Sequence, residues 1–344
     1  YVGTAYTFKT ILQEYTLWAW GSGGTGYLGQ NSQVQYSSPV QIPGINWSDI
    51  GGAKSDGTAW VWGANESGEL GLNDRTHRSS PTQLPGTTWK LIYGSVGSAG
   101  QDARRFGIKT DGTLWGWGWN QRGELGQNNR TNYSSPVQFG SDTTWPTTAN
   151  NGTFGWSNSY GTLGAIKSDG TLWMWGGNGS GILGQNQGPS QLGNVSSPVQ
   201  VPGTTWKTIS RYNIGFATKT DGTLWAWGRN EYGQLGLNTQ SPGANGISSP
   251  TQIPGTTWNQ VDGGGGSSTL ATKTDGTLWA WGYNAKGQLG QGTGDGSSTT
   301  QYSSPVQIPG TTWSKTFPMV TYVSSALKTD GTLWMWGNNE TGEL

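Results

Sequence analysis

Residues 221–236 read DGTLWAWGRNEYGQLG, and this stretch decides the fold because close copies of it run through the chain. Asp221-Gly222 predicts a tight type I′ hairpin turn, since both central positions of that turn need a positive φ. Leu224 to Trp227 predicts a strand whose two Trp side chains share one face while Leu224 and Ala226 share the other. Both faces are apolar, so each sheet must be covered on both sides by neighbouring sheets.

The Trp-x-Trp-Gly unit occurs seven times, and its copies are 42 to 58 residues apart, a period that suits a blade of about four short strands. The second Trp of the copies is Trp20, Trp62, Trp117, Trp175, Trp227, Trp281 and Trp336. An open stack of such sheets would expose two apolar end faces, and closure into a ring removes both. The sequence therefore predicts an all-β fold: residues 1–344 form a single seven-bladed β-propeller of four-stranded antiparallel blades.

Each repeat is expected to contribute its strands in a fixed order, for example Val199–Val201, Trp206–Ile209, Phe216–Lys219 and Leu224–Trp227. Twenty of the 22 Trp, those of the Trp-x-Trp units and six that open the second strand, are expected to pack in the core. The recurring Lys and Asp beside the turns are expected to meet water or cap the turn.

Two places depart from the repeat. Only six residues, Ser48 to Ala53, separate Trp47 from Lys54, too few for two strands and a reversal. Either this blade lacks its inner strand or residues are missing from the sequence, and we favour the second reading. The last repeat stops at Leu344, so closure must use Tyr1 to Lys9 or further chain; a start at Tyr1 suggests a processed or partial chain.

The composition narrows the classes of partner. Lys plus Arg and Asp plus Glu both number 19, so no net field favours nucleic acid or an anionic membrane. The absence of Cys excludes disulfides and thiolate metal sites. No apolar run approaches the ~18 residues of a membrane span, so no membrane insertion is expected.

The residues needed for catalysis are not grouped in any recognisable motif. The only histidine, His77, has no nucleophile elbow beside it. Gly21–Gly26 fits G-x-G-x-x-G but is simply the repeat's Gly-x-Asn-x-x-Gly turn, and Thr293–Gly296 offers one acid where Ca²⁺ needs several oxygen ligands. We therefore expect no catalytic residue, no metal and no cofactor.

Binding is expected at residues that break the repeat, because the strands form a scaffold. Arginine and aromatic side chains are favoured interface anchors. The candidates are Arg75, His77, Arg78, Arg104, Arg105, Trp119, Arg130, Tyr133, Trp156 and Tyr160. Arg75, His77, Arg78, Arg130 and Tyr133 occupy equivalent loops of consecutive repeats and are expected to share one rim. The alternative is ordinary loop variation.

The motif Asp-Gly-Thr-Leu-Trp-x-Trp-Gly-x-Asn-x-x-Gly-Gln-Leu-Gly, at 221–236 and 275–290, resembles the regulator of chromosome condensation repeat family. The resemblance implies a seven-bladed propeller. It also implies three functions: GTPase nucleotide exchange with chromatin binding, inhibition of β-lactamases by a secreted propeller, or the role of related bacterial and phage proteins. The long hairpin wedge and basic tail of the exchange factor are not found here.

The linker Ser303–Trp313 is similar to that of the phage and environmental bacterial members. That likeness favours a non-enzymatic binding or structural propeller in a phage virion or on a bacterial or other extracellular surface. Its partner would be a protein or a surface glycan, within a larger assembly. The alternative is a regulatory propeller, either a GTPase exchange factor or a secreted enzyme inhibitor.

Overall fold

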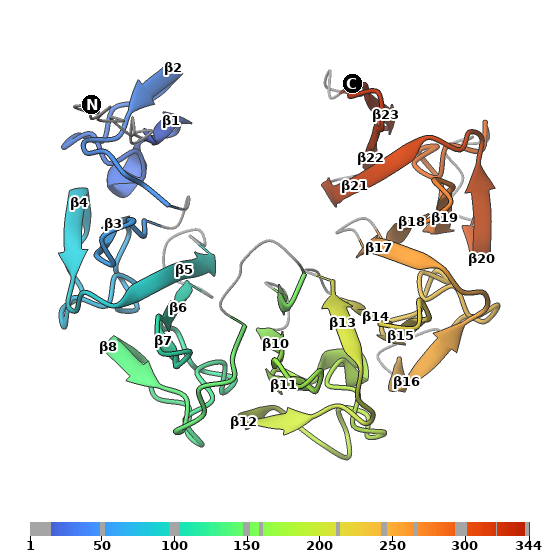
Figure 1. Cartoon of the computed structure of the whole chain (residues 1–344), viewed down its shortest axis with the longest axis horizontal. Helices are drawn as coiled ribbons and strands as arrows, with labels where there is room; N and C mark the ends of the chain where they lie inside the picture. The colour runs from blue at the N-terminus through green and yellow to red at the C-terminus, as the bar shows by residue number, and fades with distance from the viewer. Residues whose placement is uncertain are drawn as a thin grey trace, which may run out of the picture.

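The computed structural model describes residues 15–48, 52–95, 103–146, 152–157, 161–210, 214–241, 246–263, 267–292, 301–320, 322–340 and 344. Within these residues the regular secondary structure is β-strand apart from two short 3-10 segments, η1 (Gly24–Gly26) and η3 (Gly179–Gly181), and turns and loops connect the strands. The strands form seven antiparallel sheets, which follow one another around a common axis in chain order (Figure 1). We number these sheets blades 1 to 7.

Blade 1 contains β1 (Trp18–Gly21) and β2 (Tyr36–Gln41), and blade 2 contains β3 (Ala59–Gly63) and β4 (Arg78–Leu84). Blade 3 contains β5 (Trp89–Ser95), β6 (Arg104–Lys109), β7 (Leu114–Gly118) and β8 (Tyr133–Gln138). Blade 4 contains β9 (Phe154–Ser157), β10 (Thr162–Ile166), β11 (Leu172–Gly176) and β12 (Val195–Gln200). Blade 5 contains β13 (Trp206–Ile209), β14 (Ile214–Lys219), β15 (Leu224–Gly228) and β16 (Ile247–Ile253). Blade 6 contains β17 (Trp258–Gly263), β18 (Ser268–Lys273), β19 (Leu278–Tyr283) and β20 (Gln301–Ile308). Blade 7 contains β21 (Trp313–Val320), β22 (Val323–Lys328) and β23 (Leu333–Gly337).

The sequence predicts that the Ser-Ser-Pro strand is the first strand of its blade, but in the structure it is the last. β12 pairs with β11 through Trp173↔Gln200 and Met174↔Val199, so it belongs to blade 4 and not to the repeat that follows. The loop after Trp-x-Trp-Gly returns the chain to the free edge of the strand it has just left. These strands consequently lie on the outer rim, as β4, β8, β12, β16 and β20 do in Figure 1.

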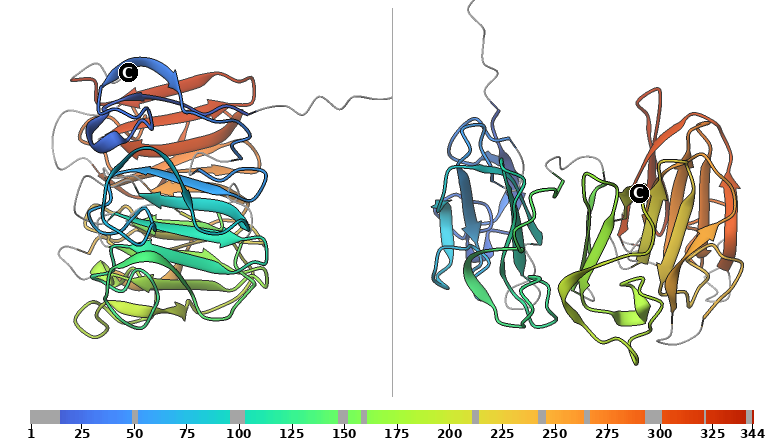
Figure 2. Two further views of the ribbon diagram at one scale, coloured as in Figure 1. Left: turned by 90° about the vertical axis from the view of Figure 1, so that its left-hand side faces the viewer. Right: turned by 60° about the horizontal axis from the view of Figure 1, so that its bottom comes forward.

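The two ends of the blades differ chemically, and we name them by their turns. The DG face carries the Asp-Gly turns between the second and third strands, such as Asp221-Gly222. The GxN face carries the segments that follow Trp-x-Trp-Gly, such as Gly228-Arg229-Asn230. The pairs Ile214↔Gly228 and Gly228↔Ile247 bring the starts of β14 and β16 to the GxN face. Figure 2 shows the strands of successive blades running across the disc between these faces.

In blades 2 to 7 the second Trp of the motif joins its blade to the preceding blade. Trp227 is 0% exposed, and its indole Nε1 donates a hydrogen bond to the backbone oxygen of Ile182 at 2.7 Å. The same bond recurs from Trp62 to Tyr27, Trp117 to Glu69, Trp175 to Glu124, Trp281 to Gln234 and Trp336 to Gln288. These indoles therefore also form a repeated polar tether between blades. The prediction that twenty Trp pack in the core is wrong at the ends of the arc, where Trp18, Trp20 and Trp334 are 49%, 62% and 49% exposed.

The Lys before each Asp-Gly turn lies between two Trp rings, where the sequence had predicted contact with water. Lys219 Nζ lies 4.7 Å from the ring centroid of Trp206 and 4.6 Å from that of Trp225. The same arrangement recurs at Lys54, Lys109, Lys167, Lys273 and Lys328. A cation over an indole face is attracted by the ring quadrupole, so these lysines stabilise the blades from the DG face.

The Asp of the turn does cap it, as predicted. The Thr223 backbone N–H and hydroxyl donate to Asp221 Oδ1 at 2.9 and 2.7 Å, and these two bonds hold the pKa of Asp221 below its ordinary value. The Thr223 hydroxyl in turn accepts a hydrogen bond from Trp225 Nε1 at 3.0 Å. The first Trp of the motif is consequently half-buried, its polar edge oriented by the turn.

Blade 2 and the two terminal blades depart from the predicted four strands. In blade 2, Trp47↔Lys54 and Ala53↔Ala59 are isolated bridges, and the short connection runs through residues outside the described ones. Blade 1 has two described strands and blade 7 has three, and they flank an opening in the arc (Figure 1). Leu333, Trp334 and Met335 of β23 are 44–57% exposed, so no described strand covers this edge of blade 7. Closure of the ring is therefore a prediction that the described residues do not test.

Candidate functional site

Most of the residues that break the repeat gather at the GxN face. Gly118 pairs with Arg104 on one side and with Tyr133 on the other, and Trp119 follows it directly. Gly63 pairs in the same way with Arg78, the start of β4. The predicted shared rim of Arg75, His77, Arg78, Arg130 and Tyr133 is thus formed at this end of blades 2 and 3. Trp156 pairs with Leu163 near the same end of blade 4, and Tyr160 lies outside the described residues.

Arginine is segregated to this face. The seven arginines of the described residues all lie at or beside it, on strand starts or loops: Arg75, Arg78, Arg104, Arg105, Arg122, Arg130 and Arg229. Six of them belong to blades 2 and 3, and we call these six together with Trp119 the arginine sector. The lysines of the Lys-Thr/Ser-Asp-Gly units lie at the DG face, whereas Lys286, in a Gly-x-Asn-x-x-Gly segment, lies at the GxN face. Among the described residues arginine is therefore the cation that distinguishes the two faces.

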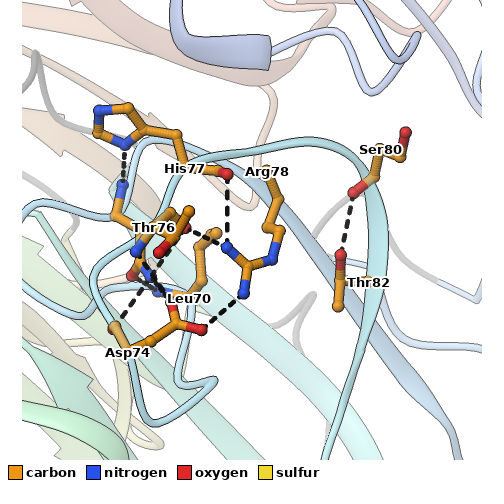
Figure 3. A network of polar contacts seen from close by, with 8 residues as sticks. Leu70, Asp74, Thr76, His77, Arg78, Ser80 and Thr82 are labelled. Carbon is orange, nitrogen blue, oxygen red and sulfur yellow. Dashed lines mark hydrogen bonds and ion pairs between the residues drawn. The ribbon is translucent and has the colours of Figure 1, made fainter.

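His77 and Arg78 form the best-ordered polar network of the arginine sector (Figure 3). Arg78 Nη2 lies 2.6 Å from Asp74 Oδ2, and Nη1 donates to the Thr76 oxygen at 2.8 Å. The Thr76 backbone N–H, and then Arg78, hold the pKa of Asp74 below its ordinary value. His77 Nδ1 accepts the Asn65 backbone N–H at 2.9 Å.

The hydrogen bond accepted by His77 has an equivalent in blade 3, where Asn132 Oδ1 accepts the backbone N–H of Asn120. The exposed His77 therefore has a structural role in its loop. Arg75 and Arg130 are also exposed, and they are the arginines of the arginine sector most accessible to a partner.

Arg104 and Arg105 are not surface anchors, because both lie on strand β6 with side chains only 1% and 8% exposed. Arg105 Nη2 donates to the Trp62 oxygen at 3.1 Å. Burial lowers the pKa of Arg105 to about 10, and the nearby Glu69 carboxylate opposes this shift. Through its bond to Trp62, Arg105 helps to join blade 3 to blade 2.

Burial raises the pKa of Glu124, against the influence of Arg104. Glu69 and Glu124 hold their own turns by accepting the backbone N–H of Ser67 and Arg122, each at 2.7 Å. In blades 5 and 6 the side-chain oxygens of Gln234 and Gln288 accept the equivalent backbone N–H groups. The two Glu residues therefore fill a turn-stabilising position that an uncharged Gln fills in other blades.

Trp119 and Tyr133 are partly buried. Trp119 stands where blades 2, 4 and 5 have Ala64, Gly177 and Arg229, and its Nε1 is buried without a hydrogen-bond partner. The Tyr133 hydroxyl accepts a hydrogen bond from Asn129 Nδ2 at 3.0 Å, and its ring packs on the core between blades 3 and 4. Trp119 therefore stays a candidate binding residue, whereas Tyr133 is largely engaged within its own blade.

The sequence reading missed a second cluster on this face, formed by Tyr232, Tyr283 and Tyr322 on blades 5, 6 and 7. The ring centroids of Tyr232 and Tyr283 are 5.0 Å apart, and those of Tyr283 and Tyr322 are 5.7 Å apart. Tyr283 and Tyr232 fill variable positions of Gly-x-Asn-x-x-Gly, and that was the available signal. Among the described residues no three or more His, Asp or Glu lie close enough together to hold a metal ion. No helix in this part of the chain is long and apolar enough to cross a membrane.

The repeats and the seven sheets together define a β-propeller of a known class. The family model of the regulator of chromosome condensation (RCC1) repeat matches residues 56–97, 111–146, 221–271 and 275–326. These matches cover more than half of the chain, which therefore belongs to the RCC1 repeat family, as predicted.

Curated relatives match parts of the chain. The mitochondrial RCC1 domain-containing protein RUG3 of Arabidopsis thaliana is 34% identical over 179 residues, 50% of this chain and 39% of that protein. Human Protein RCC2 is 33% identical over 129 residues, 37% of this chain and 23% of that protein. The chain thus spans about two fifths or less of the length of these relatives.

Two solved structures share the fold. Prp20p from Saccharomyces cerevisiae aligns with 96% of this chain and 82% of its own at 18% identity, with a TM-score of 0.68. Human WBSCR16 aligns with 94% and 90% at 17% identity, with a TM-score of 0.66. The predicted all-β propeller is confirmed.

Proposed function

We propose that this chain is a non-catalytic recognition propeller whose arginine sector, on the GxN face of blades 2 and 3, contacts a partner protein. The observation that carries this proposal is the segregation of repeat-breaking residues. On the DG face, Lys, Asp and Trp recur in six near-identical arrangements and are engaged with one another. Variation in arginine and aromatic residues is concentrated at the opposite end, where such residues serve as interface anchors.

The relatives support a protein partner. The Prp20p structure was described together with its binding properties to Gsp1p and histones. In this chain, exposed Arg75 and Arg130, on the same face as Trp119, favour an acidic surface on the partner, because complementary charge steers association and fixes its orientation. The hydrogen bond from buried Arg105 to the Trp62 oxygen, which joins blades 3 and 2, would keep that part of the face rigid.

We further propose that the protein works in a virion or on a cell surface, within a larger assembly, and that a surface glycan is the other candidate ligand. The support is the near-identity of the uncharged repeats and the likeness of the Ser303–Trp313 linker to phage and bacterial proteins. Detection of the chain in purified particles or in a surface fraction is the expected result. Recovery only as a free cytosolic protein would contradict this setting.

The regulatory alternative rests on the likeness to Prp20p and has its own test. If the chain is a GTPase exchange factor, it should accelerate nucleotide release from a small GTPase of the Gsp1p kind. We expect no acceleration, and a clear acceleration at substoichiometric chain would replace the non-catalytic proposal.

The main test compares two charge-reversed variants of equal size. A partner isolated with the wild-type chain is offered to Arg75→Glu/Arg130→Glu and to Asp221→Lys/Asp275→Lys. The first variant should weaken binding at least tenfold, and the second should leave binding within twofold of wild type, because it alters only the DG face. The reverse ranking would reject the arginine sector as the recognition surface.

A further inference from the structure

Three tyrosines form a continuous strip across the GxN face on the side away from the arginine sector. Tyr232 and Tyr283 meet edge-on, with an interplanar angle of 63°, and Tyr283 meets Tyr322 at 47°. We call Tyr232, Tyr283 and Tyr322 the tyrosine strip. Tyr232 and Tyr283 are half-buried and Tyr322 is 38% exposed, so the strip has an accessible surface and a fixed base.

The backbone at Tyr322 indicates that this ring is held in place against a local preference. Tyr322 has φ +65, a left-handed conformation that is disfavoured for any residue with a Cβ and is unusual for a bulky aromatic one. The pairs Val323↔Gly337 and Ser268↔Gly282 show that Tyr322 stands where blade 6 has Ser267, itself at φ +60. The turn therefore needs a left-handed residue, and this blade places a large aromatic side chain there. Strain of this kind clusters at ligand-binding positions.

The charges beside the strip are paired with one another. Arg229 Nη2 lies 2.5 Å from Glu231 Oε2 on blade 5, and Lys286 Nζ lies 2.6 Å from Glu340 Oε1 across blades 6 and 7. Glu340, and more weakly Tyr283 and Tyr322, raise the pKa of Lys286. With these charges balanced locally, the strip favours an uncharged ligand.

The ring geometry selects among uncharged ligands. Tilted rings make notches, whereas a sugar stacks on the flat face of a single ring. The rings of Tyr232 and Tyr322 lie at most about 11 Å apart, the order of one turn of a polyproline II helix, three residues of about 3.1 Å each. Aromatic-lined grooves recognise such helices because the ligand is already extended and loses little entropy on binding.

We propose that the tyrosine strip is a second binding site that docks an uncharged, proline-rich segment in the polyproline II conformation. The notches between neighbouring rings take proline side chains, and the phenolic hydroxyls donate hydrogen bonds to the exposed carbonyl oxygens of the segment. This site is separate from the arginine sector and does not depend on the function proposed for it.

The test uses a fluorescein-labelled decaproline peptide and a Gly-Ser peptide of the same length, with fluorescence polarisation as the measurement. The wild-type chain should bind decaproline at least tenfold more tightly than the Gly-Ser peptide. Tyr283→Ala and Tyr322→Ser should each weaken decaproline binding at least tenfold. Arg75→Ala, an exposed change on the same face, should leave it within twofold.

Thermal unfolding of the same variants separates binding from a structural role. Tyr322→Ser reproduces the residue that blade 6 carries at this position, so its Tm should equal or exceed that of the wild type while binding is lost. A Tm that falls together with the binding would overturn the proposal, because Tyr322 would then act in packing. The proposal is also overturned if the wild-type chain binds decaproline no better than the Gly-Ser peptide, or if a cello-oligosaccharide binds to the strip in its place.

Discussion

Replacing Trp227 by Phe removes one blade-to-blade tether while keeping an aromatic ring in the core. The Ile182 oxygen then loses its indole donor at 2.7 Å inside a fully buried junction. A buried carbonyl without a donor costs about 1–3 kcal/mol. The smaller ring leaves a cavity that costs about 1–2 kcal/mol more. We therefore expect the free energy of unfolding to fall by about 2–5 kcal/mol in urea denaturation followed by circular dichroism.

Trp281→Phe is the matched control. Trp281 is also 0% exposed, and its ring lies 6.0 Å from that of Trp258, as Trp227 lies 6.1 Å from Trp206. Its acceptor, the Gln234 oxygen, has a second donor in the Thr269 hydroxyl at 2.9 Å and stays satisfied after the change. Trp281→Phe should therefore cost about 1–3 kcal/mol less than Trp227→Phe. Trp281 also contacts Phe216, and loss of part of this contact would raise the cost of Trp281→Phe and so reduce the difference between the two variants. Equal costs in the two variants would refute the tether.

Three further predictions concern the scaffold. Lys219→Met keeps the aliphatic stem but removes the cation between Trp206 and Trp225, and should lower stability by about 1 kcal/mol, whereas Lys207→Met at an exposed position should change nothing measurable. Asp142 is ion-paired with Lys167; burial raises its pKa, but hydrogen bonds from Lys167 and Thr144 outweigh burial and lower the pKa to about 2. Because the folded-state pKa is depressed, this contribution to stability is complete above about pH 4 and is lost as the pH falls towards 2, so the stability difference between wild type and Asp142→Asn should shrink over that window. A difference independent of pH would contradict the ion pair. Gly233→Ala places a Cβ 2.6 Å from Ser303 Cα at a φ of +72 and should cost more than about 2 kcal/mol in thermal or urea unfolding, while Gly188→Ala, with nothing within 4 Å, should stay within about 0.5 kcal/mol.

The parts of the fold that follow from local pattern were predictable. The alternation of Leu224–Trp227 and the Asp221-Gly222 turn are properties of a few adjacent residues, and the structure confirms the strand and the hairpin. The blade to which Val195–Gln200 belongs was not readable in that way. It depends on whether the chain returns to its own edge or moves to the next sheet, and this depends on packing over some twenty residues.

The candidate site was predictable only in outline. Deviation from the repeat located the rim of blades 2 and 3, and the structure brings those loops together. The burial of Arg105 could not be predicted from the sequence, because its partners Glu69 and Trp62 belong to the neighbouring blade. The left-handed backbone of Tyr322 has no signature in a single sequence either, so the sequence offers a signal for Tyr232 and Tyr283 but none for the third ring of the tyrosine strip.

Hydrogen-exchange mass spectrometry of the chain with and without its partner is the most direct test of recognition at the GxN face. The account predicts slower exchange at residues 64–78 and 119–133 in the complex. It predicts unchanged exchange at the Asp-Gly turns, residues 110–113 and 220–223. Protection of the turns with no change at the GxN loops would contradict it.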